Sequence, residues 1–428
     1  MHLKVGNIFI KDLQFGPQTE VKNQTLFVNK DELTKLLLAD EHLASVELEI
    51  AHPGESVRIM PVKDVIEPRV KPEQEGGIFP GMASKMFTAG SGLTHVLKGV
   101  SVVTTGKIVG YQEGIIDMSG PGAELCPFSK LHNLVVVAQP VTGITPYQHE
   151  AALRLMGLKA ANYLGEAARK ITPDETISYE LLPLHAYHEN YPDLPKVAYV
   201  YMLQSQGLLH DTYFYGVDVK NMVPTLMHPT EVMDGAIVSG NCVSACDKNT
   251  TYHHLNNPVV HDLLARHGKD LCFVGCVVTN ENVTLLDKQR SSDLTAKLVE
   301  FLGVDGVIIT EEGFGNPDTD LMMNCTKIEG KGIKTVLITD EYAGQDGTSQ
   351  SLADGSPLAN AIVSGGNANA LITLPAMEKV IGNVDPVEVI AGGFKGSRST
   401  DDSITVELQA IIGATNELGF NKLTAREY

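Results

Sequence analysis

Short apolar strands alternate with helices in the C-terminal part of the chain, and this order constrains the fold more than any other feature. Residues 271–278, 306–309 and 335–338 are apolar runs rich in β-branched side chains, whereas residues 292–302 and 317–327 have helical spacing. Strands that alternate with helices form parallel sheets, and strands without polar alternation suit a sheet that is buried on both faces. We therefore expect a Rossmann-like parallel-sheet α/β domain here, with further helices over residues 357–363 and 403–418.

Three of these strands end in a similar way. Each stops at Thr, then an acidic or amide residue, then Glu, at residues 279–281, 310–312 and 339–341. The carboxyl ends of parallel strands meet at one edge of a sheet, so Glu311, Glu312, Asp340 and Glu341 can hold an ammonium group or a cation there. Alternatively, each Thr caps the next helix and the acids favour its positive end. The spacing leaves both interpretations open.

The N-terminal part is β-rich and of the α+β type. Residues 3–13, 45–70 and 96–109 have strand character, and residues 146–170 show the period of a helix, with Thr145 as its N-cap and Pro146 at its first position. The predicted fold class is therefore α/β overall, a β-rich N-terminal region followed by a Rossmann-like domain.

The charge balance limits the class of partner. The formal net charge is −19, which argues against binding to nucleic acid or to an anionic membrane surface. No run of about eighteen apolar residues occurs, so we expect no membrane span. The first residues alternate like a strand and lack the apolar block of a signal peptide, which predicts a cytoplasmic protein.

Cysteine pairs invite a metal site, but their context does not favour one. Cys242 and Cys246 are four positions apart, as are Cys272 and Cys276, and four thiolates can bind zinc. Cys272 and Cys276 lie inside an apolar strand, where both would face one side as buried thiols. We therefore predict no metal site. There is no Walker loop, and residues 90–92 lack the third glycine of a dinucleotide fingerprint. The polar stretch 185–189 is expected to be a solvated loop.

The segment Gly240-Asn241-Cys242 permits self-cleavage chemistry. Gly and Asn tolerate left-handed backbone, so a tight turn can bring the Cys242 thiolate to the carbonyl of Asn241. Attack gives a thioester, elimination of the acylated sulfur leaves dehydroalanine, and tautomerisation and hydrolysis give a pyruvoyl group. His253 or His254, which follow in sequence, can supply a base. The plain alternative is a turn with a buried free thiol.

The whole chain resembles the component B proprotein of glycine, sarcosine and betaine reductases from amino-acid-fermenting anaerobes. Residues 3–16, 240–254 and 310–341 carry the resemblance. Members are cleaved before a cysteine that becomes a pyruvoyl cofactor. Carried over, the cut lies between Asn241 and Cys242, which implies two processed subunits and two domains, one from residue 1 to 241 and the other from residue 242 to 428.

The resemblance also implies a mechanism and partners. The pyruvoyl carbonyl forms an imine with a small amine substrate, and a selenolate displaces the nitrogen in a reductive deamination, a form of covalent catalysis. The implied partners are a selenocysteine-containing subunit of component B, a selenoprotein component A and an acetyl-phosphate-forming component C. Glycine fits best and sarcosine next, whereas the quaternary nitrogen of betaine cannot form an imine. The alternatives are a non-catalytic scaffold subunit and the related D-proline reductase proprotein.

Overall fold

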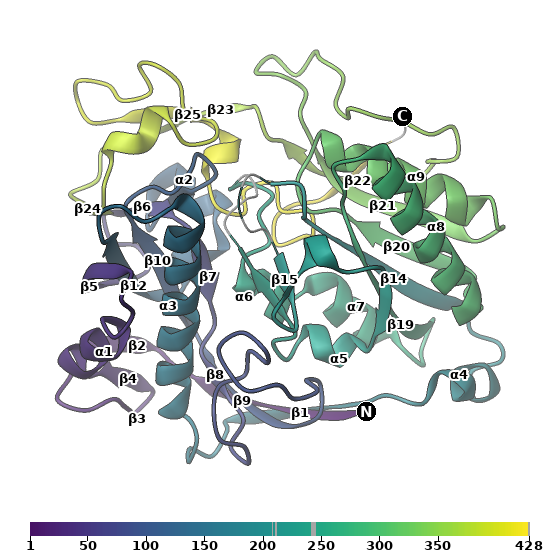
Figure 1. Ribbon diagram of the computed structural model, residues 1–428, viewed down its shortest axis with the longest axis horizontal. Helices are drawn as coiled ribbons and strands as arrows, with labels where there is room; N and C mark the ends of the chain where they lie inside the picture. Colours follow the sequence, from purple (N-terminus) through teal and green to yellow (C-terminus); the bar gives the residue numbers. More distant parts are fainter. Residues whose placement is uncertain (208, 210–211, 241–244, 427–428) are drawn as a thin grey trace.

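The computed structural model describes residues 1–207, 209, 212–240 and 245–426. The protein is a mixed α/β fold built from several sheets. In Figure 1 a β-rich half with the long helix α3 (Pro146–Glu166) lies on the left, and a large sheet flanked by α8 (Leu285–Leu302) and α9 (Asn316–Glu329) lies on the right. Strand β15 (Thr212–Phe214) and helix α6 (Thr251–Leu255) lie between them.

The large sheet has seven strands. Its order is β17 (Thr225–Met227), β19 (Cys272–Asn280), β14 (Lys196–Leu203), β20 (Gly306–Thr310), β21 (Lys334–Glu341), β22 (Ile362–Asn367) and β26 (Thr424–Arg426). The five central strands run parallel, and β17 and β26 at the edges run antiparallel to their neighbours. The parallel sheet and the helices over residues 292–302 and 317–327 are thus confirmed.

This sheet is buried on both faces, as its apolar strands predict. Along β14, Ala198, Val200 and Met202 pack in one core with side chains of α8 and α9. Tyr199 and Tyr201 pack in a second core with side chains of α7 (Pro258–Arg266). The period of two along a strand places alternate residues on opposite faces, so each face has its own core.

A bulge in β19 corrects one expectation. Cys272 and Cys276 are both buried, as predicted, but they lie in different cores. The register with β14 shifts at Val197/Ala198, which pair with Phe273 and Gly275. The extra residue reverses the side on which the following side chains lie, so the two thiols do not face one side of the sheet.

Smaller sheets form the β-rich half. One contains β5 (Leu43–Ala51), β12 (His132–Pro140), β10 (Val100–Gly106) and β7 (Asp64–Ile66); another contains β13 (Glu175–Glu180), β1 (His2–Phe9), β9 (Gly92–Lys98) and β8 (Arg69–Val70). Three-stranded sheets contain β2 (Asp12–Phe15), β4 (Thr25–Val28) and β3 (Glu20–Lys22), and β16 (Val217–Asp218), β15 (Thr212–Phe214) and β18 (Ile237–Ser239). Helix α3 begins with the predicted cap, a capping box between Thr145 and Gln148.

The two halves of the chain share sheets. β14 and β17 come from before residue 241 but belong to the seven-stranded sheet. In return, β24 (Lys379–Gly382) pairs with β6 (Val57–Val62), which also pairs with β11 (Gly114–Asp117) in the β-rich half. The expected arrangement, a β-rich region followed by a separate Rossmann-like domain, is therefore not confirmed. The pattern of residues locates strands, whereas strand partners depend on contacts across the whole chain.

Some expected helices are wrong. Residues 403–418 contain β25 (Ile404–Glu407), paired with β23 (Leu371–Leu374), and a short 3₁₀ turn, because Ile404 and Val406 alternate into a core with period two. Residues 357–363 contain turns and the start of β22 instead of a helix. The stretch 185–189, expected as a loop, lies in the short helix α4 (Leu184–Asn190).

Within the described part of the chain, no helix has the length and apolar character needed to cross a bilayer. The cytoplasmic location stays a prediction.

Candidate active site

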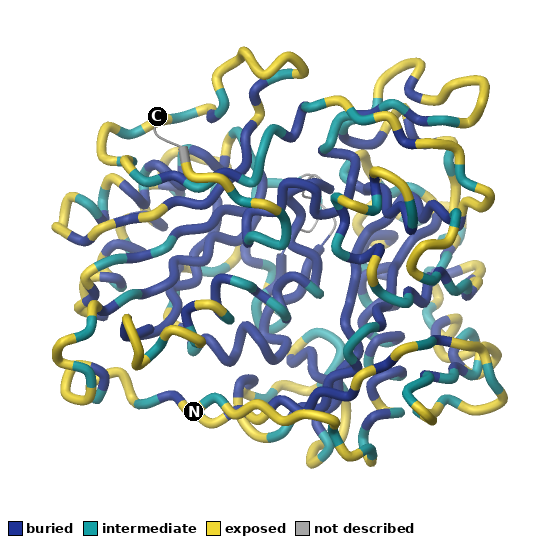
Figure 2. The backbone as a smooth tube through the Cα atoms, turned by 180° about the vertical axis from the view of Figure 1, so that it is seen from behind, coloured by how far each residue is buried: buried dark blue, intermediate teal, exposed yellow. Residues whose placement is uncertain are grey.

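Asn241 and Cys242 lie outside the described residues, but the structure places both flanks. Strand β18 leads to the buried Gly240, and the chain is described again from Ala245, which is also buried. Figure 2 shows that the segments around this central region are largely buried. The Nζ atom of Lys248 donates a hydrogen bond of 2.6 Å to the carbonyl oxygen of Gly240. Lys248, which follows the undescribed residues, thus binds the backbone of Gly240, which precedes them.

The acidic strand ends meet at the carboxyl edge of the parallel sheet. Glu281 follows β19, Glu311 and Glu312 follow β20, and Asp340 and Glu341 end β21, and all five are buried. The competing interpretation, in which the Thr of each motif caps a helix, is wrong. Thr284 caps α8 and Gly315 precedes α9, so Thr279 and Thr310 cap neither helix. The repeated motif therefore brings buried acids to one edge of the sheet.

In each of three carboxylates, one oxygen accepts a hydrogen bond and the other oxygen has no hydrogen-bond partner among the described residues. An oxygen of Glu311 accepts a hydrogen bond from the Thr339 hydroxyl, Asp340 accepts one of 2.6 Å from Thr415, and Glu281 accepts one of 2.7 Å from the backbone N–H of Glu312. The second oxygens of Glu281, Glu311 and Asp340 are buried without a hydrogen-bond partner among the described residues. Buried polar atoms are normally paired, so these oxygens indicate a site for a polar ligand.

Two acids that sequence reasoning missed complete the group. Asp247 comes shortly after Cys242 in the sequence, and Glu417 comes from near the C-terminus; both are fully buried. Both carboxyl oxygens of Glu417 and one of Asp247 lack a described hydrogen-bond partner. We call Asp247, Glu281, Glu311, Asp340 and Glu417 the acid cluster. Asp247 stands in the segment 240–254 that carries the family resemblance and could have been noticed, whereas nothing around Glu417 signals its position.

Burial dominates the protonation of the acid cluster. Desolvation raises the pKa of Glu281, Glu311, Asp340 and Glu417 well above the usual range, and neighbouring carboxylates raise it further. Desolvation also raises the pKa of Asp247, to about 7. Burial and like charge therefore disfavour ionisation of the cluster, and a cation that enters it favours the ionised form. Such a site can bind an ammonium group and can donate protons to a leaving amine.

Lys248 was also missed, although it lies within the motif. Its side chain is buried, and its charge lowers the pKa of both Asp64 and Asp247 against the larger opposite effect of burial. Its backbone carbonyl accepts a hydrogen bond of 3.2 Å from Asn416. Lys248 thus lies between the Gly240 carbonyl and the acid cluster.

The two predicted histidines have different surroundings. His254 Nδ1 lies 2.6 Å from the Tyr201 hydroxyl, and its Nε2 lies 4.0 Å from Glu312 Oε1. His253 belongs to α6 (Thr251–Leu255), and its ring packs against the rings of Phe128 and Phe420. Desolvation lowers the pKa of both rings to about 3, so both are neutral at pH 7. Only His254 faces the acidic edge, and a role as base stays a prediction for both.

Glu341 and Cys246 lie at the same edge of the sheet as the acid cluster but make different interactions. The carboxylate of Glu341 accepts hydrogen bonds from Ser351 and Ser364, at 3.0 and 2.6 Å, which ties the loop after β21 to β22. The thiol of Cys246 lies 3.6 Å from Asp247 and 3.9 Å from Asp340. These three side chains could surround a metal ion, but burial raises the pKa of Cys246 well above its usual range and disfavours the thiolate that metals bind.

Asp247 should make stability fall as pH rises. Its folded pKa of about 7 exceeds the ordinary 3.8, so its contribution to stability is fully present below pH 3.8 and is lost as pH rises through 7. We expect Asp247→Asn, in an uncleaved Cys242→Ala background, to reduce the loss of unfolding free energy between pH 4 and pH 8 by about 2–4 kcal/mol. Urea unfolding at both pH values measures it. Asp193→Asn, at an exposed position, should leave the loss unchanged, and an unchanged loss in Asp247→Asn would contradict the assignment.

Comparison with known proteins decides the family. The family model described as glycine/sarcosine/betaine reductase component B subunits matches residues 1–426. The chain belongs to this family. It is 66% identical to the glycine reductase complex component B subunits alpha and beta of Acetoanaerobium sticklandii, across the full length of both chains. It is 60% identical to the sarcosine and 39% identical to the betaine reductase complex component B subunit alpha of Peptoclostridium acidaminophilum, again across full length.

The resemblance seen in the sequence is thereby confirmed. The D-proline reductase proprotein of Acetoanaerobium sticklandii is more distant, at 24% identity over 76% of this chain and 53% of that protein. No solved structure matches this chain. Because the family members are subunits of reductase complexes, a reductase-type role in a multi-component complex follows for this chain.

Proposed function

We propose that this protein is the precursor of the substrate-binding subunits of a glycine reductase. The observation that carries the proposal is the buried acid cluster beside the cleavage motif, since a small amine is the ligand that such a site suits. Among the relatives, identity falls from glycine reductase at 66% to sarcosine reductase at 60% and betaine reductase at 39%. The low identity to D-proline reductase makes that alternative weaker.

The proposal includes cleavage between Asn241 and Cys242 and conversion of Cys242 to a pyruvoyl group. The name of the 66% relative supports it, because one full-length sequence there carries both subunits alpha and beta. The fit of the surroundings supports it too. Lys248 holds the Gly240 carbonyl, two residues before Cys242, and Asp247 lies on the other flank. Fixing the backbone on both sides of the 241–242 peptide bond favours attack by the Cys242 sulfur on the Asn241 carbonyl carbon.

The cleavage balances without a partner. The Cys242 sulfur attacks the Asn241 carbonyl carbon and the C–N bond breaks, which gives a thioester and a free amine. Elimination removes the sulfur together with the Asn241 acyl group, as a thioacid that water hydrolyses. The remaining dehydroalanine tautomerises, takes up water and releases ammonia. A pyruvoyl group at residue 242 supplies a carbonyl that condenses reversibly with a primary or secondary amine.

The acid cluster has two tasks in this proposal. The second oxygens of Glu311 and Asp340 accept hydrogen bonds from the substrate ammonium group, and its charge replaces the protons that burial otherwise holds there. When the amine leaves, the same carboxyl groups return protons to it. Glu312 and His254 lie at the edge of the site and are placed to move protons towards Tyr201.

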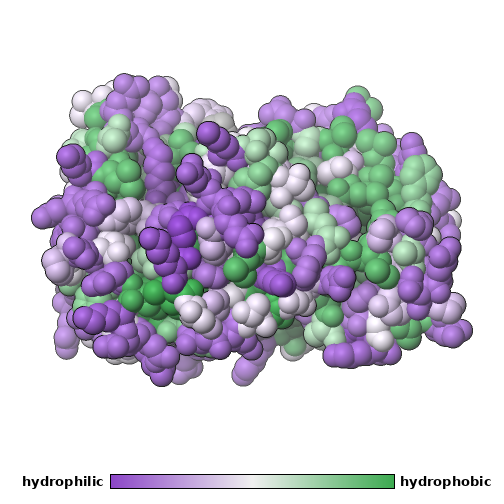
Figure 3. All heavy atoms as spheres, turned by 90° about the horizontal axis from the view of Figure 1, so that it is seen from below, coloured by the Kyte–Doolittle hydropathy of each residue, from purple (hydrophilic) through white to green (hydrophobic). Residues whose placement is uncertain are grey.

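We further propose that a selenoprotein partner supplies the nucleophile, since the chain contains no selenocysteine, and that components of the A and C type complete the complex. Apolar side chains at the start of α8 offer a docking point. Val283, Leu285 and Leu286 are 64%, 59% and 65% exposed, immediately after the strand end that carries Glu281. Exposed apolar groups of this kind mark interaction sites. Apolar side chains also gather in patches on the face of the molecule that is seen from below, which is a different part of the surface (Figure 3).

Charging this docking point should weaken the complex without harming processing. We expect Leu285→Asp/Leu286→Asp to raise the KM for the partner at least about tenfold, because a buried charge in an interface costs more than about 1.4 kcal/mol. Steady-state turnover with varied partner concentration measures it. Phe301→Asp, at a 70% exposed position at the other end of α8, is the matched control. Equal KM values in both variants would place docking elsewhere.

A denaturing gel tests the proposal against the scaffold alternative. Purified protein from a host that processes it should give two bands, one for each side of the cut, and the smaller, C-terminal one should react with borohydride and hydroxylamine. A scaffold would give one unreactive band. The two fragments should stay together in size-exclusion chromatography, since β14 and β24 cross between the halves.

A further inference from the structure

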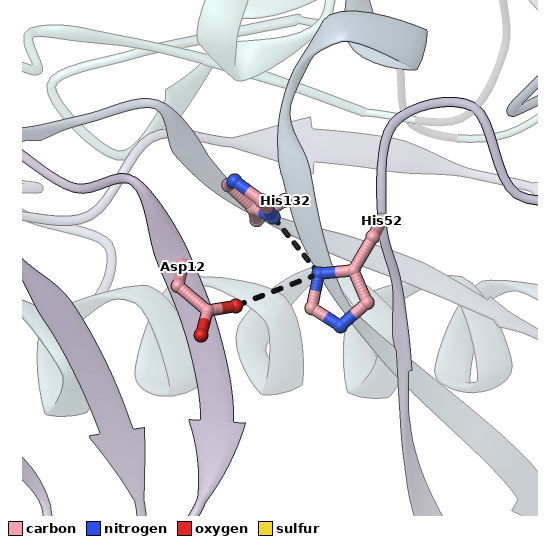
Figure 4. Close-up of side chains that lie close together, drawn as sticks. All are labelled: Asp12, His52 and His132. Atoms are coloured by element: carbon pink, nitrogen blue, oxygen red, sulfur yellow. Dashed lines mark hydrogen bonds and ion pairs between the residues drawn. The ribbon is translucent and has the colours of Figure 1, made fainter.

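Three side chains far apart in the sequence meet in the β-rich half, away from the acid cluster. Asp12 begins β2, His52 follows β5, and His132 begins β12. Figure 4 shows the Asp12 carboxylate and the His132 ring both lying beside Nδ1 of His52. His52 Nδ1 lies 2.9 Å from His132 Nδ1 and 3.9 Å from Asp12 Oδ1. One ligand-type atom from each residue lies within 4.8 Å of the other two.

We infer that Asp12, His52 and His132 form a binding site for a divalent transition-metal ion, with zinc the best match. Two imidazoles and one carboxylate are the ligand set of open zinc sites. Zinc bonds of about 2.0–2.1 Å in a tetrahedron place ligand atoms about 3.3 Å apart. The nitrogen–nitrogen distance of 2.9 Å is slightly shorter than this edge and the nitrogen–oxygen distance of 3.9 Å is slightly longer. Small side-chain adjustments therefore suffice to seat the ion.

The surroundings orient the ligands as in known metal sites. Gln14 Nε2 donates a hydrogen bond of 2.5 Å to Oδ2 of Asp12, and the backbone N–H of Leu13 donates one of 2.9 Å to Oδ1. Oδ1 is the oxygen on the side of the histidines, and its second lone pair is the one that would bind the ion. The backbone of Lys11 hydrogen-bonds the His132 ring. Partners of this kind fix the tautomer and direction of metal-binding side chains. His52 and Asp12 are 32% and 36% exposed, so an ion can enter and a water molecule can complete its coordination.

The site would connect two sheets. Asp12 belongs to the β2-β4-β3 sheet, whereas His132 is the first residue of β12 and His52 directly follows β5, both in the β5-β12-β10-β7 sheet. A bound ion would thus fasten the small sheet to the larger one, and binding to the folded state alone would raise the unfolding temperature. This inference is independent of the proposed function.

Metal titration of the untagged full-length protein tests the inference. Zn²⁺ binding is followed by calorimetry, Co²⁺ by its visible d–d bands, and Mg²⁺ serves as a non-binding ion. We expect His132→Ala to bind one equivalent of Zn²⁺ less than wild type, because the affinity of this site should fall more than about 100-fold. Losing a residue that only hydrogen-bonds a metal ligand costs roughly 10–100-fold in affinity, so a larger loss indicates a direct ligand. Asp12→Asn should weaken it too and keep the fold. His42→Ala removes a surface histidine that pairs only with Asp40 by an ion pair in the described structure, and it is the matched control.

The expected pattern is a zinc-dependent rise in unfolding temperature that wild type and His42→Ala show and that His132→Ala and Asp12→Asn lose. Circular dichroism verifies that the variants are folded. The inference is overturned if wild type binds no Zn²⁺, or if His132→Ala and Asp12→Asn bind it with wild-type stoichiometry and affinity. In the second case the ion sits elsewhere, with Cys246, Asp247 and Asp340 the other group of suitable geometry among the described residues.

Discussion

Cys242→Ala should leave the protein as a single chain of 428 residues and abolish glycine reduction by the reconstituted complex. Alanine has no sulfur to attack the Asn241 carbonyl, so neither the thioester nor the pyruvoyl group can form. We expect turnover to fall at least about a thousandfold, the scale seen when a covalent catalytic group is deleted. Denaturing gels and the rate of product formation measure the two effects.

Two other variants make this result specific. Cys242→Ser should still cleave, but more slowly, because a hydroxyl is a weaker nucleophile than a thiolate and leads to the same end group. Cys325→Ala removes a buried thiol that lies 3.3 Å from Thr335, and it should cleave and turn over like wild type. Full activity in an uncleaved Cys242→Ala protein would show that neither the cut nor the pyruvoyl group is needed.

Glu311→Gln and Asp340→Asn should cleave normally and lose most of their turnover. Each change keeps size and shape but removes the ability to balance a substrate cation and to exchange a proton. We expect kcat to fall about 10²–10⁴-fold, the usual contribution of a general acid or base. KM for glycine should rise as well, since each carboxylate offers its second oxygen to the amine. Cleavage is measured by gel, and kcat and KM by reconstituted turnover.

Glu300→Gln is the control for these variants. Glu300 pairs with Lys331 on the surface of α8, 55% exposed, and its replacement should change neither kcat nor KM. If Glu311→Gln and Asp340→Asn keep wild-type kcat, the acid cluster is a structural element and takes no part in the reaction.

The sequence predicted that these acids share one edge of the sheet, because that position depends on local order. Once the strands are recognised as parallel, the residues after each strand must share an edge, and Glu281, Glu311 and Asp340 do so. Glu417 and Lys248 were not predicted. Glu417 reaches the site from a turn-rich segment that was expected to be helical, and Lys248 gains its role from one contact to Gly240 that no pattern encodes.

The overall arrangement was harder to predict for a related reason. Strand β24 lies near the C-terminal end of the chain, but its partner β6 lies near the N-terminal end, where Val57 pairs with Lys379. Local periodicity carries no information about such pairing. The same holds for Asp12, His52 and His132, which come together only because the sheets place them side by side.

Intact mass spectrometry of the C-terminal fragment tests the central claim most directly. The account predicts a fragment that runs from position 242 to Tyr428. Compared with cysteine, its first residue should have lost one nitrogen, one sulfur and three hydrogens and gained one oxygen. Active protein whose fragment still begins with an intact cysteine, or whose chain is uncut between Asn241 and Cys242, would contradict it.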